Sequence, residues 1–380
     1  MHTPSTFDLA ICGAGPVGMA LAALLVQRGS RAAGIALLDA KSIEQARRDP
    51  RTIALSHGSR QILEEAGAWP VEATPIHQIH VSRRGQFGRS LMDRSEHGVE
   101  ALGYVARYGA VVSALADVCE RLGVASLRPA LVTGSVEDAD GVSVQIEQEG
   151  ASSTLRASLL VQAEGGLFGQ QQERAVSRDY GQSAIIAHVR TSSPIAHRAY
   201  ERFTDEGPLA LLPQDDGYAL VWCVPPTRAE QLLALDDAAF LARLGAAFGS
   251  RLGRFTHTTA RLAYPLGLNA QAGGTARTVA IGNAAQTLHP VAGQGLNLGL
   301  RDAAVLARVL AQDASPAALE RYASLRQGDR GLTVRVTDTM ARIFTGSTPA
   351  QGLLGLSLGL LDAFRPARKG LAELMMYGRR

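Results

Sequence analysis

The chain contains few cysteines, and their positions restrict its chemistry. Only Cys12, Cys119 and Cys223 occur among 380 residues, and no two of them form a Cys-x-x-Cys pair. An odd, widely spaced set argues against a disulfide framework and against a thiolate zinc site. No Ser/His/Asp arrangement stands out either. We therefore expect no bound metal and a cytoplasmic location in a reducing compartment.

The chain also lacks an excess of charge of one sign. Its 38 Lys and Arg residues nearly balance 35 Asp and Glu residues, which leaves a formal net charge of +3. No block of basic residues, internal repeat or low-complexity tract is present. We therefore expect no nucleic-acid partner.

No apolar run is suited to cross a membrane. Residues 8–26 are apolar, but no basic segment precedes them and three glycines interrupt them, so a buried strand, turn and helix is the better interpretation. Residues 352–364 are rich in Leu and Gly and are followed by Arg365, Arg368 and Lys369. This segment is too short to span a bilayer. It is either an interfacial helix with basic flanks or a terminal helix packed on the core.

A glycine-rich fingerprint occupies the first part of the chain. An apolar strand at 8–12 runs into Gly13-Ala14-Gly15-Pro16-Val17-Gly18, then a helix to about Arg28 and a second strand at 35–38 that ends at Asp39. Gly13, Gly15 and Gly18 permit a tight turn, close approach of a pyrophosphate and close helix packing, and the acid is placed for ribose hydroxyls. This pattern predicts a dinucleotide with a free 2′-hydroxyl, and FAD and NAD both satisfy it.

A second glycine turn distinguishes these cofactors. The apolar run 278–281 predicts a buried strand, and helical spacing of apolar residues begins near Leu298. The backbone amides of Gly295, Leu296 and Asn297 should therefore lie at a helix start, which favours negative charge. A reduced flavin carries such charge at its N1/C2 carbonyl edge, so the turn favours FAD.

The remaining patterns predict an α/β fold with two sheets. Strand-like residues at 76–92, 184–190 and 209–224 form a second sheet between the nucleotide-binding segments. We expect a Rossmann-like FAD-binding domain with an inserted mixed β-sheet substrate domain and C-terminal helices, and substrate bound between the sheets. The expected ranges are 1–75, 99–180 and 270–345 for the FAD-binding domain, 76–98 and 181–269 for the substrate domain, and 346–380 for the C-terminal helical segment, with linkers at 313–316 and 346–349.

Four segments carry a family resemblance over nearly the whole chain: 13–18, 49–56 (Asp-Pro-Arg-Thr-Ile-Ala-Leu-Ser), 200–213 with Tyr-Glu-Arg-Phe-Thr and Gly-Pro-Leu-Ala-Leu-Leu-Pro, and 282–302. Together they are similar to the p-hydroxybenzoate-hydroxylase-like FAD monooxygenases, and most to their ubiquinone-biosynthesis hydroxylases. The resemblance implies bound FAD, reduction by NADPH or NADH, and oxygen transfer from O2 through a flavin C4a-hydroperoxide. It implies a 2-polyprenyl-6-methoxyphenol as substrate and the 1,4-benzoquinol as product.

The same resemblance assigns roles to cofactor-binding residues. Arg51 lies across the FAD pyrophosphate, and Gly293 and Gly295 let the backbone approach the ring. Asn283 replaces the aspartate of most relatives at a ribityl hydroxyl and can still accept that hydrogen bond. Asn297 is a flavin contact, the helix cap, or both. The segment Ala163-Glu164-Gly165-Gly166 departs from the usual Ala-Asp-Gly, a motif linked to FAD and NAD(P)H binding in these relatives.

Catalytic and substrate residues are less sharply indicated. His289 with Pro290 adjoins the expected ring position and could assist phenol deprotonation, although a structural loop histidine is an equal alternative. Phe203 and Leu211 are candidates for the aromatic pocket, and core packing alone would also explain them. His188 and His257 are read as ordinary strand or surface residues.

Alternatives remain open. One alternative is a hydroxylase of the same pathway that acts at another ring carbon. Another is a non-catalytic FAD-binding scaffold, which the altered motif at 163–166 suggests. An NAD-dependent dehydrogenase is a third interpretation, and it predicts a colourless protein. A greasy substrate implies peripheral contact with the inner face of the cytoplasmic membrane and association with other ubiquinone-biosynthesis enzymes.

Overall fold

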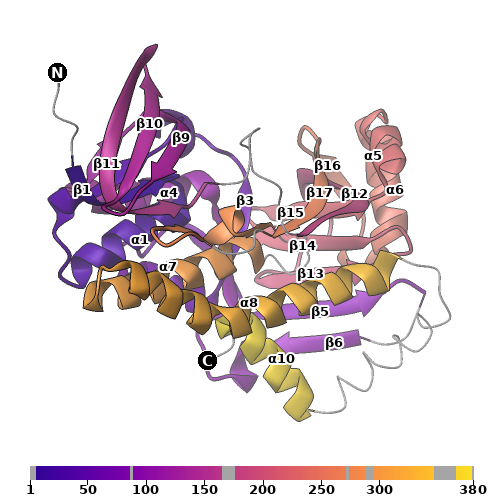
Figure 1. The fold of residues 1–380 in the computed structure, drawn as a ribbon. Helices are drawn as coiled ribbons and strands as arrows, with labels where there is room; N and C mark the ends of the chain where they lie inside the picture. Colours follow the sequence, from indigo (N-terminus) through magenta and orange to yellow (C-terminus); the bar gives the residue numbers. More distant parts are fainter. Residues whose placement is uncertain are drawn as a thin grey trace.

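The computed structural model describes residues 6–85, 89–164, 176–270, 274–287, 294–345 and 365–378. Two large sheets lie side by side, the first on the left and the second on the right of Figure 1. This arrangement confirms the expected fold class, a Rossmann-like α/β unit with an inserted mixed sheet and C-terminal helices.

The first sheet is built around β1 (Thr6–Cys12). β1 pairs in parallel with β2 (Ile35–Leu38) and with β11 (Ala151–Gln162). The helix between β1 and β2 returns the chain to the end of the sheet where β1 begins, so β2 runs in the same direction as β1. Residues 9–12 of β1 are buried, as expected for a central parallel strand. The other strands of this sheet are β8 (Ala125–Leu127), β9 (Leu131–Glu137), β10 (Val142–Gln148) and β18 (Thr278–Ala280).

Helices pack on this sheet and on one another. α1 (Pro16–Gln27) is buried along nearly its whole length and contacts α4 (Tyr108–Arg121) and α7 (Gln294–Gln312). The chain leaves α7 at Gln312 and enters α8 (Pro316–Thr345), so the linker is residues 313–315, one residue shorter than the expected 313–316. The linker expected at 346–349 lies outside the described residues. Shorter elements of this half are η1 (Ala32–Gly34), α2 (Ile43–Arg47), α3 (His57–Glu65) and η4 (Gly282–Ala284).

The second sheet has the strand order β19-β17-β12-β15-β14-β13-β5-β6, with β16 paired to β12. Its face toward α5 (Pro226–Leu233) and α6 (Asp237–Phe248) carries a core that includes Tyr218 and Trp222. These two helices cover the outer side of the sheet in Figure 1. The strands are β5 (Gln78–Arg83), β6 (Arg89–Asp93), β12 (Val176–Thr191), β13 (Arg198–Phe203), β14 (Pro208–Gln214), β15 (Gly217–Val224), β16 (Phe255–Thr258), β17 (Leu262–Ala270) and β19 (Gln286–Thr287), with η2 (Arg94–Glu96) and η3 (Ser250–Leu252) in their connections.

Two features depart from the expected organisation. A three-stranded sheet of β3 (Thr52–Ser56), β7 (Gly103–Arg107) and β4 (Ala73–Ile76) joins the two halves. The second sheet also includes residues 176–180 and 286–287, which the sequence patterns assign to nucleotide-binding segments. The reason is that β12 continues as one strand paired with β17 from Val176 onward, and β17 in turn pairs with β19.

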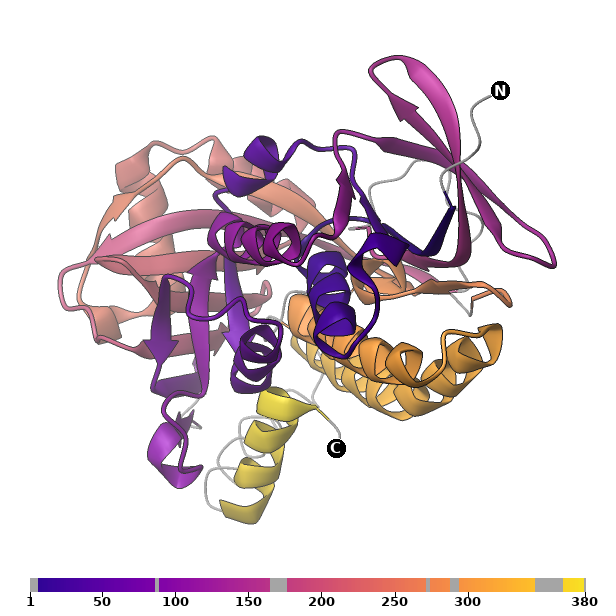
Figure 2. The same ribbon diagram turned by 90° about the vertical axis from the view of Figure 1, so that its left-hand side faces the viewer.

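The last described element is a helix that packs against α3. α10 (Arg365–Tyr377) begins where the basic flank of the segment 352–364 was expected, and that segment itself lies outside the described residues. α10 contacts α3, where a Cβ at Gly58 would lie only 2.7 Å from the Met376 carbonyl oxygen. Figure 2 shows this yellow helix beside the purple α3. None of the helices within the described ranges combines the length and apolar character needed to cross a bilayer.

All three cysteines are free and buried, so we expect their thiols not to react with thiol reagents in the folded protein. Burial raises the pKa of the Cys119 thiol to about 12 and raises the pKa values of Cys12 and Cys223 as well. Because the thiolate is the reactive form, dithionitrobenzoate at pH 8 should label none of them in the folded protein and all three after denaturation. Rapid labelling of even one thiol under native conditions would contradict this burial.

Candidate functional site

The first glycine turn is tightly packed at two of its three glycines. Gly13 has φ of +103°, its amide donates to the Leu38 carbonyl at 2.7 Å, and a Cβ there would lie 2.6 Å from the Ala163 carbonyl carbon. A Cβ at Gly18 would lie 2.0 Å from the Gly13 carbonyl oxygen. Helix α1 therefore rests directly on the turn, and neither position accepts a side chain.

Gly15 is not packed against backbone as the other two glycines of this turn are. No side chain caps the start of α1, and a Cβ at Gly15 would meet only the Tyr108 hydroxyl, at 3.0 Å. Uncapped amides at a helix start and an open backbone suit an anionic group such as a pyrophosphate. The residues present therefore fit the phosphate part of FAD.

Asp39 is fastened at the end of β2 by backbone donors. Its Oδ2 accepts from the Ala14 amide and its Oδ1 from the Lys41 amide, both at 2.9 Å. Each carboxylate oxygen keeps a further lone pair for a ribose hydroxyl. Arg128 donates to the Ala14 carbonyl at 3.2 Å and lies 3.7 Å from Asp39, with only 6% of its side chain exposed. Sequence reasoning missed Arg128, since an isolated arginine 114 residues away carries no local pattern.

Arg51 is held beside the first turn. Its Nη2 donates to Asp49 at 2.7 Å, and its guanidinium stacks 4.5 Å from the centre of the Tyr108 ring. Burial would raise the pKa of Asp49, but the bonds and charge of Arg51 outweigh it and lower the pKa. Tyr108 thus contacts Arg51 with its ring and approaches Gly15 with its hydroxyl. Tyr108 links Arg51 to the open side of Gly15, and the role of Arg51 at a pyrophosphate stays a prediction.

The second turn lies against the same helix as the first. Gly282 has φ of +59°, and its amide donates to Asp302 Oδ2 at 3.1 Å. A Cβ at Gly299 would lie 2.8 Å from Val17, the residue two positions after Gly15. Gly282 and the second turn of α7 therefore lie against Val17 near the start of α1, an arrangement compatible with one cofactor held by both glycine turns. Asn283 directs its amide oxygen toward Gly295, 3.6 Å from where a Cβ would lie.

Asn297 does not cap α7. The helix begins at Gln294, and the Asn297 side chain instead accepts from the Ser56 amide at 2.8 Å and the Ser59 hydroxyl at 2.7 Å. Its Nδ2 donates to the Ala54 carbonyl at 3.0 Å. The side chain thereby joins α7 to the corner between β3 and α3, and a contact with flavin through the backbone stays a prediction.

A buried ionic network supports the second turn from behind. Asp302, fully buried, accepts from Arg326 Nε at 2.8 Å, and Arg326 Nη1 donates to Asp329 at 2.6 Å. Arg301 also donates to Asp329, at 3.2 Å. These residues connect α7 and α8 to Gly282, so the position of the turn depends on the network.

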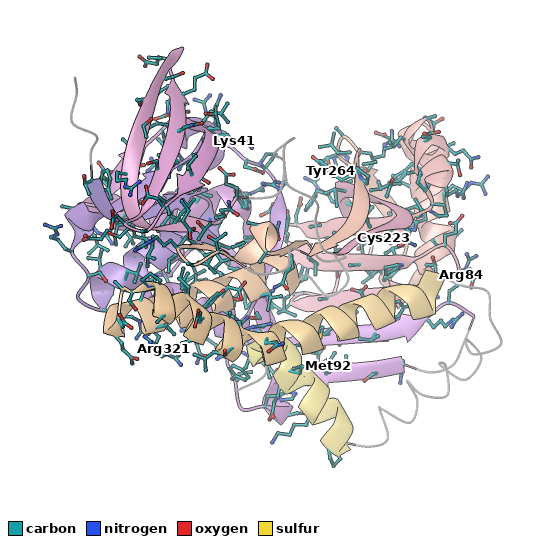
Figure 3. The ribbon with its side chains drawn as sticks, viewed as in Figure 1. Lys41, Arg84, Met92, Cys223, Tyr264 and Arg321 are labelled. Atoms are coloured by element: carbon teal, nitrogen blue, oxygen red, sulfur yellow. The ribbon has the colours of Figure 1, made fainter. Side chains whose placement is uncertain are left out.

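The substrate sheet has an accessible row of side chains on the face opposite α5 and α6. Strand register aligns five residues across β13, β14, β15, β12 and β17. Four of these side chains are partly exposed although their strands lie in the interior of the sheet, and the fifth, Leu262, is 54% exposed. We call Glu201, Ala210, Val221, Ile186 and Leu262 the accessible row. Tyr264, labelled on β17 in Figure 3, is 45% exposed and lies on the same face.

The predicted pocket residues fall differently on this sheet. Leu211 is fully buried in the core beneath α5 and α6, so its assignment to the pocket is wrong. Its neighbours Ala210 and Leu212 point to the other face, because side chains alternate along a strand. Phe203 lies on the face of the accessible row but is only 1% exposed, and its role stays a prediction. A hydrogen bond of 2.9 Å between Thr52 and Gln214 fastens this sheet to β3.

The remaining predictions concern the segments around the turns. His289, Pro290 and Gly293 lie outside the described residues. Glu164, in the altered motif, follows β11 beside Gly13, and burial together with the charge of Asp39 raises the pKa of its carboxyl to about 7. His188 is an ordinary strand residue whose Nε2 lies 3.1 Å from the Gln214 carbonyl.

Comparison with known proteins agrees with this geometry. A family model described as an FAD binding domain matches residues 6–330. Ubiquinone hydroxylase UbiL of Rhodospirillum rubrum is 32% identical, over 95% of this chain and 87% of the relative. The 3-demethoxyubiquinol 3-hydroxylase of Escherichia coli is 30% identical, over 94% of this chain and 95% of the relative. The p-nitrophenol 4-monooxygenase PnpA of Pseudomonas putida has the same fold, with a TM-score of 0.76 at 17% identity over the whole of both chains.

The fold, the two turns and these similarities lead to one conclusion. The family model covers most of the chain, and both hydroxylase relatives extend over nearly all of it. The chain belongs to the FAD-binding-domain family, as an FAD-dependent monooxygenase of the p-hydroxybenzoate-hydroxylase type.

Proposed function

We propose that this enzyme hydroxylates the aromatic ring of a polyprenyl phenol in ubiquinone biosynthesis, with electrons from NADPH or NADH and oxygen from O2. The observation that carries the proposal is similarity over nearly the whole chain to two hydroxylases whose names place them in ubiquinone metabolism. The mostly apolar accessible row of the substrate sheet supports it, since a prenylated phenol needs apolar surface.

The residues of the two turns would hold FAD between them. Gly15, the uncapped start of α1 and Arg51 would receive the pyrophosphate, Gly13 would shape the turn, and Asp39 would bind the ribose. Asn283 would accept from a ribityl hydroxyl, and the start of α7 would face the ring through the amides of Gly295, Leu296 and Asn297. Bound FAD supplies the activation of oxygen after reduction by the nicotinamide, and the oxygen-transfer route implied by the family resemblance is part of this proposal.

The protein contributes position and exclusion of water. We assign cofactor binding to residues 1–75, 99–180 and 270–345 and substrate binding to 76–98 and 181–269, except that 176–180 and 286–287 lie in the substrate sheet, and we keep 346–380 as a separate C-terminal segment. The phenol would lie between the second sheet and the start of α7, where apolar side chains keep water from the reacting atoms. His289 and Pro290 adjoin this place in sequence and stay candidates for proton transfer. Peripheral membrane contact and association with other enzymes of the pathway belong to the same proposal.

The reacting ring carbon has two candidates. We favour the carbon para to the hydroxyl of a 2-polyprenyl-6-methoxyphenol, because the family resemblance implies this substrate and the 1,4-benzoquinol as its product. The Escherichia coli relative favours the alternative, since its name describes hydroxylation at position 3 of a demethoxyubiquinol. The two activities consume different precursors and give products of different mass.

Expression in cells that lack the ring hydroxylases, followed by mass spectrometry of quinone precursors, tests the proposal. Loss of the 2-polyprenyl-6-methoxyphenol and recovery of quinone is expected. Recovery at a different carbon would replace our assignment with the alternative. The purified protein should be yellow, and its flavin should be reduced by NADPH or NADH in stopped flow. Failure of reduction even with phenol present would favour a scaffold role.

A further inference from the structure

Glu201 stands out because it alone carries a charge in the accessible row. Its partners across the sheet are Val81 on β5 and Ala210 on β14, and beyond Ala210 the row continues with Val221. Among the described residues no hydrogen bond or ion pair reaches its carboxylate. A carboxyl group placed on an apolar surface without a partner is costly to keep charged, and such groups occur mainly where a ligand uses them.

The adjoining core explains why Glu201 faces this way. Tyr200, the residue before it, is 2% exposed and packs on the side of α6. Alternation therefore directs Glu201 to the opposite face, the one that carries the exposed Leu262 and Tyr264. Its carboxyl lies on the face of the sheet where we place the phenol.

The elements next to Glu201 contact its surroundings through apolar side chains, α10 at Val81 and the small sheet at Ala199, and few charged groups of the substrate sheet itself share its face. Cys223 on β15 lies diagonally across the sheet, and its thiol stays protonated because burial and the charge of Glu201 raise its pKa. Arg83 on β5, His188 on β12 and Tyr264 on β17 share the face but lie in other rows. Burial in this apolar surrounding raises the pKa of Glu201 to about 7.

The geometry points to Glu201 as a catalytic residue that accepts the hydroxyl proton of the phenol. This inference rests on the proposed function. The phenol O–H bond breaks, an O–H bond forms on the Glu201 carboxyl, and the electron pair stays on the phenolate oxygen. The phenolate makes the carbons ortho and para to it more nucleophilic toward an electrophilic oxygen. No oxidant or reductant enters this step.

The acidity of Glu201 suits the transfer. An ordinary glutamate has a pKa of about 4.3 and a phenol one of about 10, so a group near 7 closes roughly half the gap between them. Glu201 must be ionised to act as a base. Turnover is therefore expected to increase as the pH rises through about 7 and to level off above it.

The test compares the FAD-loaded enzyme with its Glu201→Gln variant. We expect kcat to fall roughly 100-fold, in the range typical of a lost general base, and the rise of rate near pH 7 to disappear. FAD content and flavin reduction without phenol should not change. Glu201→Asp should restore part of the rate. The matched control is Glu206→Gln in the following loop, where the exposed carboxylate pairs with Arg228, and its kinetics should remain those of the parent.

A binding measurement separates this inference from the proposed function. A 2-methoxyphenol with one prenyl unit is added to the oxidised enzyme, and its phenolate absorbance is followed against pH. The parent should bind it as phenolate at lower pH than Glu201→Gln does. Equal ionisation and equal pH profiles in parent and variant overturn the role of Glu201. A parent that ionises the phenol but forms no hydroxylated product overturns the proposed function and leaves the role in proton transfer supported.

Discussion

Replacement of Gly18 by alanine is expected to yield a protein that purifies without FAD. The new Cβ would lie 2.0 Å from the carbonyl oxygen and 3.2 Å from the carbonyl carbon of Gly13, and backbone atoms cannot rotate away as a side chain can. Either α1 moves outward or the turn opens, and both displace the amides that receive the pyrophosphate. Overpacking of this kind costs about 1–3 kcal/mol, which corresponds to a loss of FAD affinity of roughly 5- to 150-fold.

The ratio of flavin to protein absorbance after purification, and a titration of the apoprotein with FAD, measure the effect. Gly370→Ala in α10 is the control, because nothing lies within 4 Å of its Cβ position. Alanine is the better helix former by about 1 kcal/mol, so this control should keep its FAD and lose no stability. A Gly18→Ala protein with full flavin content and unchanged affinity would refute the tight contact between α1 and the turn.

Replacement of Arg326 by methionine should cause the largest loss of stability. Arg326 is 4% exposed and donates to Asp302 and Asp329, which are 0% and 4% exposed. Methionine fills similar space but removes the Arg326 charge from the buried Asp302 carboxylate, which keeps the bond from the Gly282 amide. Removal of one partner of a buried pair costs about 3–5 kcal/mol, so the free energy of unfolding should fall by that amount.

Chemical denaturation measures this loss, and Arg321→Met provides the matched control. Arg321 lies on the same helix and pairs with Asp313 at 2.8 Å, but both side chains are exposed. An exposed pair contributes less than about 1 kcal/mol, so the control should unfold almost as the parent does. Because Asp302 holds Gly282, Arg326→Met should also weaken FAD binding. Equal losses in the two variants would contradict a supporting role for the network.

The amino-terminal nucleotide-binding unit could be predicted because its evidence is local. Strand, turn, helix, strand and acid follow one another between Thr6 and Asp39, and each step has its own sequence pattern. The helix that follows the second turn could be predicted for the same reason, since apolar residues from Leu298 onward repeat with helical spacing. Interactions between residues close in the chain decide these elements, and the sequence displays such interactions directly.

The orientation of side chains in the substrate sheet could not be read in this way. The run Pro208 to Pro213 is apolar throughout, so no alternation indicates that Leu211 faces the helices and Ala210 the accessible row. A shift of one residue in register would exchange the two faces. Pairing with β13 and β15 decides the matter, and with it the position of Glu201.

The sequence by itself determined the class of fold, the two glycine turns and the family. The tertiary structure decided which distant residues complete the site. Arg128 reaches Ala14, Asn297 reaches Ser56, and Asp302 supports Gly282 from a pair of packed helices. These contacts depend on how helices and sheets pack after they form. No spacing within the chain encodes that packing in a readable way, because the partners meet only through surfaces that the whole fold brings together.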